Sequence, residues 1–113
     1  MKSEAIIEAG ICGFQTVVQG DCADGETVRM SLSSSCEKIQ GLGEAIKSLG
    51  PIDPLEEISS QNESRLMHAA RTTLKGCCVG CAVPVGIFKV MQVAAGFALP
   101  KDITITLSKR DSA

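Results

Sequence analysis

The feature that most constrains the fold is a long apolar stretch, residues 82–99, which follows a short segment rich in glycine and cysteine. Pro84, a residue favoured at the first position of a helix, opens this stretch. Lys89 and Gln92 are the only polar side chains in residues 85–98. Such a helix is apolar on nearly every side, so we expect it to lie through the middle of the domain and to form the centre of the core.

The same stretch is about as long as a membrane span, but it contains Pro84, Gly86, Lys89, Gln92 and Gly96, and a buried helix is the better interpretation. The first eight residues are too short and too acidic for a secretory signal, so a cytoplasmic protein is expected. A net charge of -2 and a pI near 5.3 provide no electrostatic footprint for nucleic acid or an anionic membrane, and neither partner is expected. A homo-oligomer stays open.

Alternating apolar residues predict strands at 4–9, 14–19 and 27–33, and Asp24-Gly25 predicts a hairpin between the last two. Val28, Met30 and Leu32 are expected on one face. If the two strands pair symmetrically about the hairpin, Phe14 lies near Ser35 and Cys12 lies near Glu37.

Capping pairs predict two further helices, from Ser34 to about residue 49 and from Ser60 to about residue 75, with a short helical turn after Asp53-Pro54. A last strand is expected at 103–107. The sequence therefore predicts one α+β domain over 1–113, with an antiparallel sheet of three to four strands, three helices and a frayed tail at 108–113.

Six cysteines in a reducing compartment favour metal ligands or redox thiols over a disulfide framework. Cys78 and Cys81 have the C-x-x-C spacing that lets one turn bind one metal or form one disulfide. The hairpin register brings Cys12 and Cys36 together at the mouth of the hairpin and at a helix N-terminus. We therefore predict a site for zinc or an iron–sulfur cluster. Its ligands are Cys12, Cys36 and Cys81, with Cys78 as the fourth.

A structural interpretation of Cys12 and Cys36, as buried residues that fill space, stays open beside this one. Cys22 lies beside the hairpin turn and is expected to have no role. His68, the only histidine, is expected to be structural and partly exposed. No catalytic residue is assigned.

The layout resembles the NifU-type iron–sulfur cluster scaffold proteins over residues 4–98. The matching places are Cys12-Gly13, Ser35-Cys36 and Gly80-Cys81, or Cys78 in place of Cys81. The family's acidic residue after Cys-Gly is Phe14 here, and the histidine before its third cysteine is Gly80. The resemblance implies a SufE/NifU-like fold with a thiolate site.

Three functional interpretations follow. The first is a cysteine-rich protein that binds a metal or an iron–sulfur cluster, as a scaffold or carrier. The second is a thiol-active protein in which Cys77, Cys78 and Cys81 exchange disulfides or carry persulfide sulfur. Either would have a protein partner in cluster or sulfur transfer. The third is a structural or interaction domain with inert cysteines.

Overall fold

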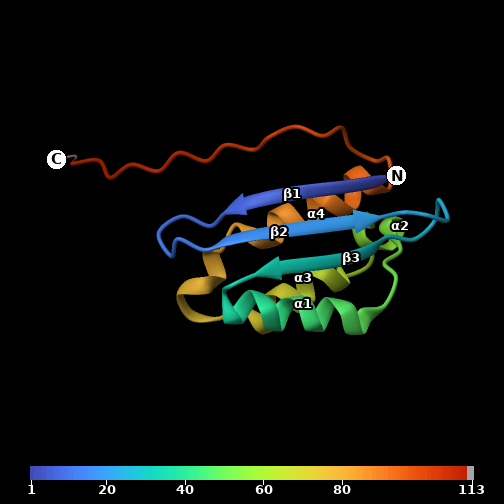
Figure 1. Ribbon diagram of the computed structural model, residues 1–113, viewed down its shortest axis with the longest axis horizontal. Helices are drawn as coiled ribbons and strands as arrows, with labels where there is room; N and C mark the ends of the chain where they lie inside the picture. The colour runs from blue at the N-terminus through green and yellow to red at the C-terminus, as the bar shows by residue number, and fades with distance from the viewer. Residues whose placement is uncertain (112–113) are drawn as a thin grey trace.

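The computed structural model describes residues 1–111, which form an α+β fold built on one three-stranded antiparallel sheet (Figure 1). The strands are β1 (Lys2–Glu8), β2 (Gln15–Asp21) and β3 (Arg29–Ser34), in the order β1-β2-β3. The inner face predicted for the third strand is confirmed. Val28, Met30 and Leu32 are buried or half-buried, whereas Arg29 and Ser31 are exposed.

The register between β2 and β3 differs by one residue from the symmetric pairing, because Thr16 pairs with Ser34. The cause is the connection, which is longer than a two-residue turn. The Asp24 carboxylate accepts hydrogen bonds from the backbone N–H groups of Glu26 and Thr27, and this arrangement shapes a wider loop.

In the part of the chain that the structure describes, four α-helices and one 3-10 helix follow the sheet. They are α1 (Glu37–Leu49), α2 (Pro54–Ile58), α3 (Arg65–Thr73), η1 (Gly76–Gly80) and α4 (Val83–Ala94). In Figure 1, α4 passes behind β1 and β2, and α1 lies beside β3. α4 packs against β1 and β2, α1 packs against β3, and α3 packs against both α1 and α4. The sheet thus has one face covered by helices and one face in water.

Two predicted helix starts are corrected by the structure. Cys36, not Ser34, is the N-cap of α1, and the Ser34 hydroxyl instead accepts a hydrogen bond from the Cys36 N–H. Helix α3 begins after Ser64 rather than Ser60, because the Ser64 hydroxyl accepts from the Met67 N–H. In both cases several serines precede the helix, and the pattern of residues does not choose among them.

The core is aliphatic and continuous from the sheet to α3, with α4 contributing the most buried side chains of any helix. The expectation that this helix is surrounded on all sides is wrong: Val85 is 46% exposed and Lys89 is exposed. The segment Gly76–Ala94 has the length and hydropathy of a membrane-spanning helix, yet in the fold Ile87, Val90 and Met91 are buried in this core.

The tail after α4 corrects the prediction of a last strand. Residues 101–111 are in no strand or helix, and Figure 1 shows them as an extended segment that runs back in the direction of β1. Ile103, Ile105 and Leu107 are 54%, 67% and 89% exposed. A strand forms only when a neighbour pairs with it, and here none does. Of the predicted frayed end, 108–111 is irregular, and 112–113 lies outside the described residues.

Candidate functional site

Three segments that carry cysteines lie at the same end of the molecule (Figure 1). β1 and β3 both run toward this end, as does α3. The β1–β2 loop, the start of α1, and η1 with the start of α4 therefore meet there. We call residues 9–14, 35–38 and 75–83 the cysteine end.

Cys12 lies in the β1–β2 loop and is exposed. Gly10 and Gly13 both have positive φ, at 93° and 74°, and the Gly13 N–H donates to the Gly10 carbonyl at 2.9 Å. This tight turn is accessible to glycine and strained for other residues. It projects Cys12, together with the fully exposed Ile11, away from the sheet.

Cys36 occupies the N-cap of α1, where its carbonyl accepts the first helical hydrogen bond, from the Gln40 N–H at 2.9 Å. Its side chain is half-buried and packs against the core. The Lys38 ammonium donates to the Lys75 carbonyl at 3.4 Å, so the first turn of α1 touches the residue that precedes η1. The start of α1 is thereby tied to the cysteine turn.

The cysteine turn is a single stretch of 3-10 helix, in which the Cys81 N–H donates to the Cys78 carbonyl at 3.1 Å. Cys78 and Cys81 are half-buried against the same core as Cys36, whereas Cys77 is exposed. Five residues of chain thus provide two half-buried thiols and one exposed thiol.

The structure brings the segments of Cys12, Cys36, Cys78 and Cys81 to one end but does not bring the side chains into one coordination shell. Within residues 1–111, no group of three or more histidine, cysteine, aspartate or glutamate side chains is placed to hold a metal ion. Cys22 lies beyond the opposite end of β2 and is buried in the core.

His68 and two acidic residues near helix starts, Glu63 and Asp53, have structural partners. His68 Nδ1 lies 3.1 Å from Glu63 Oε1, and the two side chains are 60% and 74% exposed. The Asp53 carboxylate caps α2 by accepting from the Leu55 N–H at 3.0 Å. Neither arrangement is directed at the cysteines.

Glu57 has a structural role that the sequence does not reveal. Its buried carboxylate accepts from the Ser64 hydroxyl at 2.7 Å and from the N–H groups of Arg65 and Leu66 at 2.9 and 3.0 Å. It therefore caps α3 from the preceding helix rather than its own. The only sequence signal for this role is the position of Glu57 in the first turn of α2, where an acidic residue is expected to cap its own helix.

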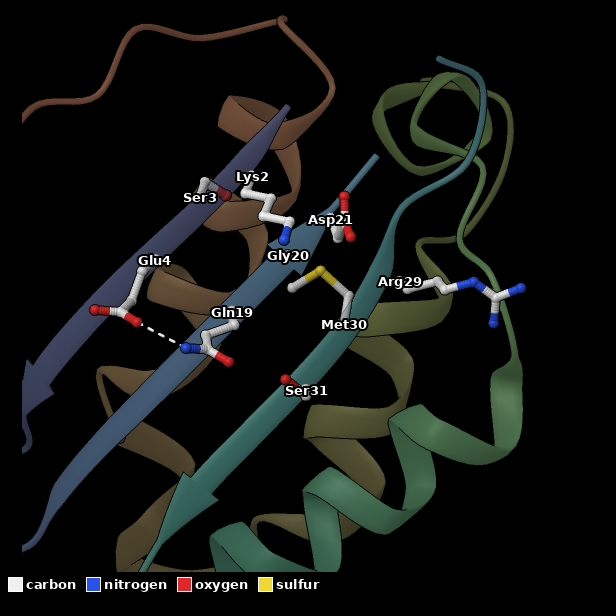
Figure 2. A pocket seen from close by; sticks show the side chains of 9 residues that line it. All are labelled: Lys2, Ser3, Glu4, Gln19, Gly20, Asp21, Arg29, Met30 and Ser31. Atoms are coloured by element: carbon white, nitrogen blue, oxygen red, sulfur yellow. Dashed lines mark hydrogen bonds between the residues drawn. The ribbon is translucent and has the colours of Figure 1, made fainter. Parts of the chain in front are cut away.

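At the end of the sheet farthest from the cysteines, the outer face has a shallow polar depression (Figure 2). Glu4 accepts a hydrogen bond from Gln19 at 2.8 Å, and Lys2, Asp21 and Arg29 follow one another across the three strands. The charges of Lys2, Asp21 and Arg29 alternate in sign along this row, and the Glu4 carboxylate is paired with the Gln19 amide. This surface is a balanced, solvated sheet face.

A family model described as a family of unknown function, DUF6951, matches residues 3–107. No curated protein matches the chain, and no solved structure matches it.

Proposed function

For a chain that belongs to the DUF6951 family, whose function is unknown, we propose that the cysteine end binds a thiophilic metal, as zinc or an iron–sulfur cluster. The observation that supports the proposal is the convergence of three cysteine-bearing segments that are distant in sequence. Cys36, Cys78 and Cys81 are half-buried against one core, and the Lys38–Lys75 hydrogen bond joins their segments. The resemblance to NifU-type scaffolds points the same way.

In the described conformation no three of the four thiols are placed to share a metal ion, so binding requires both the β1–β2 loop with Cys12 and the cysteine turn to move toward Cys36. The β1–β2 loop suits such a movement. Its closing hydrogen bonds are the one between Gly13 and Gly10 and the 3.2 Å bond from the Ala9 N–H to the Phe14 carbonyl. Glycines at both ends of the turn can change φ without a side-chain clash.

Metal analysis of anaerobically purified protein, with a visible spectrum to distinguish a cluster from zinc, tests the proposal. We expect Cys12→Ser, Cys36→Ser and Cys81→Ser each to weaken binding by more than tenfold. Loss of a residue that only supports a metal ligand lowers metal affinity about 10- to 100-fold, and loss of the ligand itself should lower it at least as much. Cys22→Ala is the matched control, because Cys22 is buried at the other end of β2 and an alanine keeps that site apolar. Metal content that does not depend on Cys12 and Cys36 would overturn the proposal.

A thiol-active protein is the second candidate, favoured by the accessibility of Cys77 beside the C-x-x-C pair. An exposed thiol can attack a disulfide, and a second thiol in the same turn can resolve the mixed disulfide. This function needs only residues 77–81. If Cys77→Ser or Cys81→Ser abolishes exchange with a small disulfide reagent, while Cys12→Ser leaves both exchange and a metal-free spectrum unchanged, this candidate replaces the first.

A further inference from the structure

We propose that the tail is a strand for a second copy of this chain: residues 103–107 of each copy pair with the free edge of β1 in the other. The exchange unites two features that are unsatisfied within one chain, an exposed apolar segment and an open sheet edge. It concerns a surface separate from the cysteine end and does not depend on the proposed metal site.

The donor segment has the pattern of a strand without the pairing. Ile103, Ile105 and Leu107 alternate with Thr104 and Thr106, and the threonines are also residues enriched in strands. All three apolar side chains are more than half exposed. The family match extends to residue 107, where the alternation ends, so the segment belongs to the unit that the family shares.

The acceptor is β1, which within residues 1–111 pairs with β2 on one side and with no strand on the other. The other side carries unpaired backbone N–H and C=O groups, which can template another strand. Ala5 and Ile7 on its inner face are half-buried and already contact the core. A strand added there would continue the sheet over α4, whose Val85 is 46% exposed.

One parallel register satisfies both the apolar and the charged residues. When Ile105 lies beside Ala5, Ile103 and Leu107 fall beside Ser3 and Ile7, so all the apolar side chains face α4. On the outer face the same register places Asp102 beside Lys2. Antiparallel alignment of the same three apolar residues would instead place Asp102 beside Glu8, two like charges.

A second copy is the occupant because within one chain the segment stays exposed although it runs back past its own sheet (Figure 1). Each copy has one donor segment and one free β1 edge, whereas β3, the other edge strand, has α1 packed against it. An exchange between two copies therefore leaves no donor segment and no free β1 edge over, which is the closed arrangement that two-fold dimers adopt.

The first test is sedimentation equilibrium of the full chain in reductant, so that the exposed Cys12 and Cys77 thiols form no disulfide dimer. We expect a reversible dimer, and we expect Ile105→Asp to raise its dissociation constant about 100-fold by placing a charge on the buried face in both halves. The control Thr104→Ser, on the outer face, changes no charge and should leave it nearly unchanged. A full chain that stays monomeric at every attainable concentration would overturn the proposal.

The second test distinguishes exchange from docking of the tail onto its own chain. Lys2→Asp and Asp102→Lys each place like charges side by side, and each alone should dimerise about tenfold more weakly. Mixed in equal amounts, they restore opposite charges at both junctions of a heterodimer, and dimerisation should return to the wild-type level. If the tail docks within its own chain, mixing the two variants does not restore dimerisation, and only the double variant Lys2→Asp/Asp102→Lys regains the opposite charges. That result would refute exchange.

Discussion

Two carboxylates organise the backbone around them, one in water and one in the core. Asp24 accepts hydrogen bonds from the N–H groups of Thr27 and Glu26 and from the Thr27 hydroxyl at 2.8 to 2.9 Å, and these lower its pKa from 3.8 to about 2. The buried Glu57 carboxylate likewise accepts hydrogen bonds, from Ser64 and from the first turn of α3. A prediction about a single side chain follows from each carboxylate.

Because the folded pKa of Asp24 lies below the unfolded value, its ionised form stabilises the fold above pH 3.8, and this contribution is lost as the pH falls toward 2. We expect an NMR titration of Asp24 to give a midpoint near 2. The difference in free energy of unfolding between wild type and Asp24→Asn should shrink across the same interval in urea denaturation. A titration midpoint at the ordinary value would contradict the hydrogen-bonded loop.

Glu57→Ala would leave three donors at the start of α3 without their acceptor. Each buried unsatisfied donor costs about 1–3 kcal/mol, and partial hydration lowers the sum, so we expect a loss of roughly 3 kcal/mol in the free energy of unfolding. Glu57→Gln keeps an acceptor oxygen and should lose less. Glu56→Ala, its exposed neighbour, should be within about 0.5 kcal/mol of wild type. Equal losses at both positions would refute the capping role.

At the scale of elements, α4 approaches β1 closely at Gly86. A methyl group added at Gly86 would overlap the Ile7 Cδ1 atom, and it would lie 3.0 Å from Ile7 Cγ1. At Gly41 in α1, the same methyl would meet only Thr73 Cγ2, at 3.9 Å. Packing against Ile7 thus requires glycine at position 86, whereas the space around position 41 would accept a larger residue.

We therefore expect opposite effects from the same substitution. Gly41→Ala should raise the free energy of unfolding by up to about 1 kcal/mol, since alanine favours a helix and finds open space. Gly86→Ala should lower it by about 1–2 kcal/mol because of crowding against Ile7. The double variant Gly86→Ala/Ile7→Val removes the overlapping atom and should recover most of the loss in chemical denaturation. If Gly86→Ala alone is stabilising, β1 and α4 are farther apart than described.

The elements differ in how well their sequences predict them. The alternation of Val28, Met30 and Leu32 with polar residues specifies β3 and its inner face, because one side of that sheet is buried. Helix starts were predictable to within a few residues only, since Ser34 and Ser60 have the same local chemistry as true caps. The segment 103–107 has the pattern of a strand but no neighbour, which a local pattern cannot reveal.

For the whole molecule, the topology predicted from the order of elements places the cysteine segments at one end, as Figure 1 shows. Whether Cys12 and Cys36 share a coordination shell was not predictable, because it depends on where the β1–β2 loop points and not on the register of the strands. The cap from Glu57 likewise joins two helices through the intervening loop. Relations between elements are fixed by the completed fold, and residue spacing alone does not contain them.

The hydrogen bond from the Ser3 hydroxyl to the Val90 carbonyl, at 2.7 Å, joins residues that are 87 positions apart. The first strand of the sheet is therefore completed by α4. Until α4 has been synthesised, the inner faces of β1 and β2 lack their cover, and a nascent chain holds Ala5, Ile7 and Val18 open to water and to chaperones. Long-range closure of this kind makes folding slow relative to a helical bundle of equal length, and the domain can first become stable once α4 has emerged.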